Sequence, residues 1–314
     1  MARLPLQKRS MGLAVGAIVA LFVLGLFLPA HWTQLLTRVL IMALFATSLN
    51  IQVGYAGMLP LGHSMFLGLG AYSFCLLLVK TGMPQILAFP LALLISTAMS
   101  VIIGYFCLKS NEPMTFGLLH LAFNILLSTL INKWITFTGG EVGITGISRP
   151  GILADTTYFF FFVLAWFVVC YIVIGIIVSS PFAKAAHGLR ENEERLRFLG
   201  VNIARFQLVI FTISGLFAAV AGILLSMLDK GAFPAYITLT KSAEALMMCL
   251  IGGMFSFFGP TVGAAIVVVF GTVTSIYISQ WQGLLGVIIL ACVIGLRGGI
   301  LGRGRKIGVS GGGS

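Results

Sequence analysis

The chain has 314 residues, of which 59% are hydrophobic and only 9% are charged, and its mean hydropathy is +1.09. A soluble domain carries about 25% charged residues, so this composition excludes a soluble protein and predicts an all-α polytopic membrane protein. The formal net charge of +11 would suggest nucleic-acid binding in a soluble protein, whereas in a membrane protein it indicates loops biased toward one side of the bilayer.

The chain opens with a basic stretch, Met1–Ser10, followed by an apolar run, Met11–Pro29, that is long for a signal-peptide core. Because no small-residue cleavage site precedes His31, we expect this run to be retained as the first membrane span. A span needs about 20 apolar residues, and on that criterion we expect about ten spans. The other nine are Leu35–Val53, Leu61–Val79, Gln85–Leu108, Phe116–Ile131, Tyr158–Val178, Gln207–Leu228, Ala243–Met254, Thr261–Ile278 and Gly283–Leu296.

The eighth of the ten predicted spans, Ala243–Met254, is shorter than a full span. It contains the pair Gly252-Gly253 and is followed by Gly259-Pro260, which predicts a broken or re-entrant helix. We expect one transmembrane domain over residues 1–306, with a cytoplasmic loop at 180–206 and a flexible Gly/Ser tail at 307–314 that is typical of a linker.

The lysine and arginine positions predict the orientation of the chain. With the amino terminus inside, ten spans place both termini, the turn at Lys109 and the 180–206 loop in the cytoplasm. Thirteen of the 19 basic residues then lie inside, which obeys the positive-inside rule, whereas the reverse topology inverts the ratio. The six outside residues are Arg38, Lys80, Lys133, Arg149, Lys230 and Lys241.

The longest polar interruption of the chain runs from residue 180 to residue 205, and six of the eight positions from 190 to 197 are charged. Ser180 suits a helix N-cap, Pro181 suits the first helical position, and Gly200 suits the left-handed position after a helix. We therefore expect one continuous, capped helix between two membrane spans.

This predicted loop helix has both charged and apolar side chains. Glu191 with Arg195 and Glu193 with Arg197 are i,i+4 pairs in the favourable order, each contributing roughly 0.2–0.5 kcal/mol to an isolated helix. Two alternatives fit such a helix equally well: it contacts a partner protein, or it is a solvated loop helix whose apolar side chains rest on the lipid headgroups. The apolar side chains available for either contact are Leu189, Leu196, Phe198 and Leu199.

Four stretches of the chain match the motifs of one family, in that family's order and over most of the chain. The loop fits the pattern REN-E-R-LG-N--R, and the stretch from Asn50 to Tyr72 is similar to N-x-Q-x-GYAG-x-x-SLGH-x-x-F-x-G-x-GAY. Thr138–Ile147 is similar to TGG-x-x-GL-x-GI, and Ile251–Ala265 to GG-x-GT-x-x-GP-x-x-GA. The chain thereby resembles the LivM-type permease subunits of high-affinity branched-chain amino acid ABC importers.

The chain also departs from that family's pattern at three places. Pro60 stands where a serine is usual, Phe255-Ser256 replaces the usual Gly-Thr, and residues 110–132 match poorly.

The resemblance implies a permease subunit of an ATP-driven importer in the bacterial inner (cytoplasmic) membrane, carrying branched-chain or other hydrophobic amino acids. The implied partners are a second, homologous permease subunit, two cytoplasmic ABC ATPase subunits and a periplasmic or surface-tethered binding protein, with no nucleic acid. The loop is then the segment that couples ATP hydrolysis to transport. Its candidate coupling residues are Arg190, Glu191, Asn192, Glu194, Arg195, Leu196, Leu199 and Gly200.

The stretch after residue 50 places polar side chains beside a glycine-rich break. Backbone that bends at membrane depth is tolerated only where protein buries it or where it faces a water-filled cavity, which favours a translocation-pathway or gating site. The structural alternative is close helix packing at Gly62, Gly68 and Gly70, with a hydrogen-bonded structural histidine at position 63. The pathway candidates are Asn50, Gln52, Gly54, Tyr55, Gly57 and His63.

The sequence shows no chemistry of its own that could drive transport. All eight acidic residues lie in polar segments or at span ends, so no clear mid-bilayer carboxylate marks ion coupling. There is no G-x-x-x-x-G-K-[ST] motif, no metal-ligand cluster and no nucleophile–base set, and the five cysteines are single core-like residues. We expect no catalytic residue, metal or cofactor in this chain, and we expect ATP and Mg²⁺ to be bound by the ATPase partners.

Two rival functions stay open at this stage. A urea or short-amide permease of the same superfamily shares the loop and the glycine-rich motif. A stand-alone secondary transporter or channel is the less favoured rival, and it differs by predicting transport by this chain without an ATPase.

Overall fold

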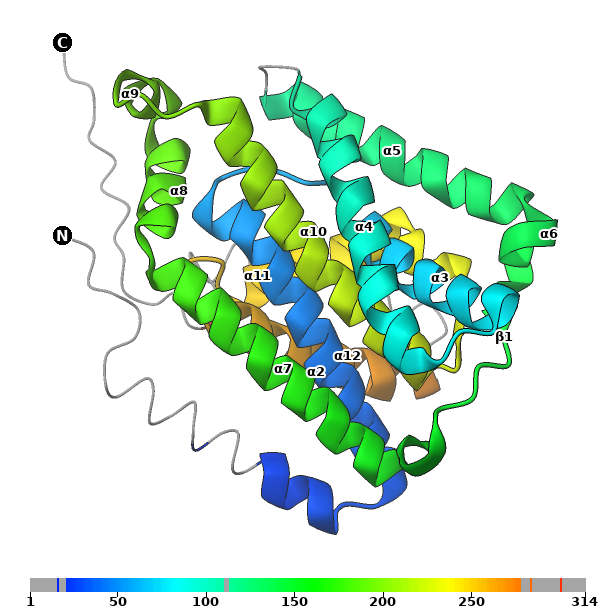
Figure 1. The fold of residues 1–314 in the computed structure, drawn as a ribbon. Helices are drawn as coiled ribbons and strands as arrows, with labels where there is room; N and C mark the ends of the chain where they lie inside the picture. Colours follow the sequence, from blue (N-terminus) through cyan, green and yellow to red (C-terminus); the bar gives the residue numbers. More distant parts are fainter. Residues whose placement is uncertain (1–15, 17–20, 110–112, 278–282, 284–299, 301–314) are drawn as a thin grey trace.

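The computed structural model describes residues 16, 21–109, 113–277, 283 and 300, and over these residues the chain is a bundle of helices (Figure 1). The long helices are α2 (Ala30–Asn50, continued by a π-helical segment at Ile51–Tyr55), α3 (Ser64–Thr81), α4 (Gln85–Cys107), α5 (Pro113–Lys133), α7 (Thr156–Ser179), α10 (Ile203–Leu228), α11 (Leu239–Gly252) and α12 (Gly259–Tyr277). Shorter elements are α6 (Ile135–Thr138), α8 (Pro181–Glu191), α9 (Glu193–Phe198), the two-residue strands β1 (Ile144–Thr145) and β2 (Gly231–Ala232), and 3₁₀ turns at Gly140–Val142, Gly151–Ala154 and Pro234–Ile237.

Within the described residues, six helices are long and apolar enough to cross a membrane: α2, α3, α4, α5, α7 and α10. They coincide with the second to seventh predicted spans, which confirms a multi-pass, helical membrane protein. The predicted first span is described only at residue 16 and from residue 21 onward, and the predicted tenth span lies outside the described residues apart from Gly283. The 307–314 tail lies wholly outside them.

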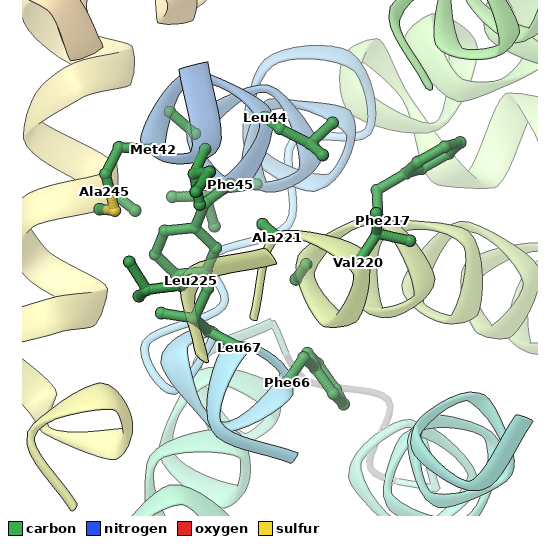
Figure 2. Close-up of a cluster of buried hydrophobic side chains, with 14 of the residues drawn as sticks. Met42, Leu44, Phe45, Phe66, Leu67, Phe217, Val220, Ala221, Leu225 and Ala245 are labelled. Atoms are coloured by element: carbon green, nitrogen blue, oxygen red, sulfur yellow. The ribbon is translucent and has the colours of Figure 1, made fainter. Parts of the chain in front are cut away.

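Helices α2 and α10 form the centre of the bundle. Every residue of α2 from Val39 to Asn50 is buried, and α10 packs against α2, α3 and α4. Helices α4, α5 and α7 keep large apolar side chains on their outer faces, as lipid contact requires. Figure 2 shows the resulting core, in which Phe45 of α2, Leu67 of α3, Leu225 of α10 and Ala245 of α11 belong to one cluster of buried side chains.

Small residues bring α3 and α10 into close contact. A Cβ atom added to Gly70 would collide with the backbone of Ala219, and one added to Gly222 would collide with the carbonyl oxygen of Leu67. Lipid is as apolar as the helix surface, so membrane helices associate through close backbone approach of this kind. The packing alternative predicted for the glycines after residue 60 is therefore confirmed at Gly70.

The end of α10 is closed by a side chain from a distant loop. Arg149 donates hydrogen bonds to the carbonyl oxygens of Met227 and Leu228, both at 2.8 Å, and its guanidinium stacks on the ring of Phe159. These are carbonyls that the helix itself leaves unpaired. Beside them β1 and β2 pair antiparallel, a small local exception to the all-α prediction.

The predicted short eighth span corresponds to α11, which has 14 residues and ends at Gly252; the next residue, Gly253, has a φ of +108°. Its partner α12 follows after a tight turn, and the two helix backbones are in contact. An added Cβ at Gly252 or Gly263 would collide with the backbone of the other helix. The prediction of a shortened helix before the Gly259-Pro260 pair is confirmed.

We expect Gly222→Ala to lower the melting temperature of the detergent-solubilised protein, because forcing extra volume into a packed site costs about 1–3 kcal/mol. Gly175→Ala is the matched control in α7, where the added Cβ would meet only a ring atom of Phe257 at 3.6 Å. It should leave the melting temperature unchanged or raise it, because alanine is the better helix former. Equal melting temperatures for Gly222→Ala and the wild type would contradict the packing described here.

Candidate functional site

The polar loop forms two helices, α8 and α9, at one end of the bundle, here called the loop end (Figure 1). The prediction of one continuous helix is wrong because the chain is extended at Asn192, with φ −164° and ψ 103°. The Asn192 side chain accepts a hydrogen bond from the backbone N–H of Arg195 at 2.8 Å and so caps a new helix. The break separates Glu191 from Arg195, and no ion pair joins them among the described residues, whereas the predicted pair of Glu193 and Arg197 is present at 3.0 Å.

The two ends of the loop differ in how they are capped. Ser180 holds the N-cap position of α8, but its hydroxyl donates to the carbonyl of Ile177 instead of accepting from the helix. Gly200 has φ +83°, which confirms the left-handed turn predicted there. Asn202 then caps α10 by accepting from the N–H of Arg205 at 3.1 Å.

The apolar residues of the loop divide between the inside and the outside of the protein. Leu189 and Leu196 are buried, so they anchor α8 and α9 to the bundle. Phe198 and Leu199 are 84% and 76% exposed, side by side at the end of α9. Of the four apolar loop residues, only Phe198 and Leu199 are therefore exposed for contact with another molecule, because Leu189 and Leu196 pack inward.

Arg190 connects the loop to the broken end of α2. Its guanidinium donates to the carbonyl oxygen of Gly54 at 2.8 Å and lies 4.2 Å from the ring centroid of Phe255. The side-chain stem of Arg190 passes so close to Gly57 that a Cβ there would lie 2.7 Å from it, and Gly57 itself has φ +71°. Next to this contact, the ring of Tyr55 meets the ring of His187 on α8.

Three of the four family-like motifs meet around Arg190. The loop supplies Arg190, the stretch after residue 50 supplies Gly54 and Gly57, and the α11–α12 turn supplies Phe255 and the carbonyl of Met254, against which Gly54 packs. The fourth motif, Thr138–Ile147, lies elsewhere, since β1 within it pairs with β2 after the end of α10.

The π-helical segment explains why Gly54 offers its carbonyl to a side chain. A π-helix changes the backbone hydrogen-bond spacing, and such segments occur frequently at functional sites. The carbonyl must find a donor because the surroundings are apolar, and Arg190 provides one with a full charge.

The other pathway candidates are buried inside the subunit. Asn50 and Gln52 are at most 1% exposed, and the Asn50 side-chain oxygen and both polar atoms of the Gln52 amide have no hydrogen-bond partner among the described residues. His63 stacks on Phe45 and shares a 3.0 Å hydrogen bond with the hydroxyl of Ser48. Of the six pathway candidates only Gly57 borders the cavity at this end of the molecule.

That cavity has a volume of about 570 Å³ and opens between the loop and the ends of α4, α5 and α10. Charged residues of the loop, among them Glu191, Glu193 and Arg197, line one side, and Gly57 and Leu59 line the other. Across the described residues, no three His, Cys, Asp or Glu side chains come together as metal ligands. Charged side chains of the loop and apolar residues of the bundle thus line the same cavity.

Sequence reasoning does not find two of the participants in this site. Phe255 stands out in the sequence only as a departure from the family pattern, and nothing there gives His187 a role. No local signal connects Phe255 to Arg190 or His187 to Tyr55, because the two residues of each pair lie far apart in the chain. The same holds for Arg190 and Gly54, which are 136 positions apart.

A family model described as "Branched-chain amino acid transport system / permease component" matches residues 32–294. The branched-chain amino acid transport permease LivM of Salmonella typhimurium is 29% identical over 74% of the chain, and LivM of Escherichia coli is 29% identical over 80%. The matches span 61% and 66% of the lengths of those two relatives, less than two thirds. No solved structure matches the chain.

More distant relatives have other substrates in their names. The autoinducer 2 import permease LsrC of Salmonella paratyphi B is 23% identical over 79% of the chain. The L-arabinose permease AraH of Escherichia coli is 26% identical over 44% of it.

We expect Asn192→Ala to loosen α9, because removal of an N-cap costs about 1 kcal/mol. Hydrogen exchange of the amides from 193 to 199 should become several-fold faster, while α8 stays protected. Asn192→Asp keeps an acceptor at the cap and serves as the control. If both variants exchange alike, the break between α8 and α9 does not depend on this cap.

Proposed function

The chain belongs to the permease family of branched-chain amino acid transport systems, and from this premise we propose that it is the membrane subunit of an ATP-driven importer for branched-chain amino acids. The observation that supports the substrate class is the 29% identity to two LivM permeases over 74% and 80% of the chain. The relatives that carry autoinducer 2 or L-arabinose are less similar to this chain or cover less of it.

The proposed assembly contains this chain, a second homologous permease, two cytoplasmic ABC ATPases and an extracytoplasmic binding protein, all at the bacterial inner membrane. ATP and Mg²⁺ are bound by the ATPases. In this arrangement the loop end faces the cytoplasm, as the distribution of lysine and arginine predicts. Residues 180–206 then act as the coupling loop of a single transmembrane domain, 1–306.

Phe198 and Leu199 would make the contact with the ATPase. They are large apolar side chains exposed at the tip of the loop, and burying each would contribute roughly 1.5–3 kcal/mol. Glu194 and Arg195 lie beside them on α9, where charges fix the register and choice of partner more than the affinity.

Arg190 would carry movement of the loop into the bundle. Helix α7 leads into α8 with only Ser180 between them, and α10 starts a few residues after Gly200, so displacement of the loop acts on both helices. Through Gly54 and Phe255, Arg190 also links the loop to α2 and to the α11–α12 turn. A displacement of the loop would thus reach α7, α10, α2 and the α11–α12 turn, and so both helices at the centre of the bundle.

The unpaired side-chain oxygen of Asn50 and the unpaired amide of Gln52 fit a conformational change at this point. A buried polar group without a partner costs about 1–3 kcal/mol, so a second arrangement of the π-helical segment that pairs these groups would lie close in energy. This supports a gating role for the break in α2, with the pathway itself opening between the two permease subunits.

We expect Phe198→Ala to weaken binding of the solubilised permease to its ATPase by about tenfold or more, through lost apolar burial. Leu196→Ala is the matched control on the same helix. Because Leu196 packs inward, its truncation should lower the melting temperature and leave ATPase binding nearly unchanged. The opposite pattern would place the ATPase on a different surface.

The function itself is tested in proteoliposomes that contain both permeases and the ATPases, with the loaded binding protein outside. We expect leucine uptake that requires ATP. Arg190→Gln should reduce uptake by about tenfold or more while ATP hydrolysis continues, because it loses a charged hydrogen bond to Gly54. Lys184→Gln, an exposed change on the same helix, should transport normally.

Two results would contradict the proposal. Uptake by this chain alone, driven by an ion gradient, would make it a secondary transporter. Normal coupling in Arg190→Gln would show that force does not pass through the Gly54 contact.

A further inference from the structure

A second cluster of charged residues lies at the end of the bundle opposite the loop, here called the far end. Arg38 of α2 donates to the Asp229 carboxylate at 2.5 Å, and Lys241 pairs with Glu244 of α11 at 2.7 Å. Both pairs line one cavity of about 210 Å³. Two cations and two anions thus face the same small space, and Glu244, which the sequence places at a span end, is largely buried.

Two of these charges stand at helix ends that repel them. Asp229 follows the last residue of α10, where the helix dipole is negative, and Lys241 lies in the first turn of α11, where it is positive. Stability alone favours the reverse charges at both positions. Arg38 and Tyr236 instead stabilise the charge of Asp229, and Glu244 stabilises that of Lys241. This indicates that the signs of the two charges serve a function other than helix stability.

The Asp229 carboxylate is fully engaged and Arg38 is not. Tyr236 donates its hydroxyl to the second oxygen of Asp229 at 2.6 Å. Burial, together with the nearby carboxylate, raises the pKa of Tyr236, so it stays a donor. Arg38 gives one nitrogen to Asp229, has no other hydrogen bond to the described residues, and its side chain is 48% exposed.

The Arg38–Asp229 pair also stands between two cavities. A wider space of about 340 Å³ shares Arg38, Asp229, Thr272 and Ser275 with the inner one. Past the pair, the inner cavity is bordered by Met42, Leu225, Met248 and Val267, all buried apolar side chains of four different helices.

We propose that this far-end pocket is a binding site for a zwitterionic amino acid with an aliphatic side chain. The α-carboxylate pairs with Arg38 and Lys241, the α-ammonium pairs with Glu244 and Asp229, and the side chain contacts Met42 and Met248. A zwitterion offers one group of each sign to a neutral set of two cations and two anions, whereas a single ion does not. The inference rests on the proposed function and deepens it by giving the substrate its own contacts within this chain.

The exposed Arg38–Asp229 pair would open as the substrate enters. An ion pair in contact with water contributes little to stability, so a ligand carboxylate can displace Asp229 from Arg38. The amino acid would then pass from the wider cavity to the inner one.

The test uses Ser275→Cys, which borders both cavities, in the reconstituted complex with Cys292→Ser. The other four cysteines are buried. A membrane-impermeant maleimide should label the introduced thiol from the outside, and leucine should slow the labelling. Leucinamide, which lacks the carboxylate, and 4-methylpentanoate, which lacks the ammonium group, should each protect about tenfold more weakly or worse, the loss expected for one charged hydrogen bond.

The variant Arg38→Gln should remove the preference for leucine over leucinamide, and Arg38→Lys should restore part of it. Lys133→Gln, an exposed change outside the pocket lining, is the control and should behave as the wild type. In the same vesicles Arg38→Gln should lower leucine uptake by about tenfold or more.

The outcomes separate this inference from the proposed function. If the wild type imports leucine and Arg38→Gln imports it equally well with unchanged protection, the pocket assignment is wrong and the importer assignment stands. If Arg38→Gln retains protection by leucine but loses stimulation by the binding protein, the pocket serves that protein and the inference is wrong. If the wild-type complex carries no amino acid, both are wrong.

Discussion

The hydrogen bond from Arg190 to the carbonyl of Gly54 is the contact on which the loop end depends. A helix that breaks inside a membrane protein leaves backbone groups without partners, and an apolar environment makes this costly. Here a charged side chain from a distant loop satisfies the freed carbonyl and stacks on Phe255 at the same time. The hydrogen bond that pairs the free carbonyl of Gly54 thereby also fixes the position of the loop.

Close contacts that involve the backbone also hold the rest of the bundle together. Glycines at the α3–α10 and α11–α12 crossings allow backbones to touch, and Arg149 closes the carbonyl end of α10. Such tight crossings make the helices move as units, since a packed interface does not deform gradually. In the proposed importer, a displacement of α8 and α9 would therefore shift whole helices and not single side chains.

Charged residues gather at the two ends of the molecule and differ in character. At the loop end they surround exposed Phe198 and Leu199, as at a docking surface for another protein. At the far end Arg38, Asp229 and their neighbours surround small cavities with buried apolar walls, as in a site for a small molecule. Helices α2 and α10 extend between these ends. In the proposed importer, these two helices would therefore connect the loop that contacts the ATPase to the pocket that binds the amino acid.

The sequence by itself determined the class of protein and most of its helices. Hydropathy located the spans that became α2, α3, α4, α5, α7 and α10, and glycine and proline placed the short α11 and the turn at Gly200. These features follow from properties of neighbouring residues. The break at Asn192 belongs with them, because an asparagine before two glutamates is a local N-cap signal, although we predicted a continuous helix there.

Only the tertiary structure decided which surfaces meet. It put Arg190 on Gly54, turned Leu196 inward and Phe198 outward, buried Asn50 and Gln52, and joined Arg38 to Asp229 across 191 positions. In a uniformly apolar helix no face is marked as the inner one, since lipid and protein core favour the same side chains. The choice of face comes from close packing over the whole bundle, and no short stretch of sequence contains that information.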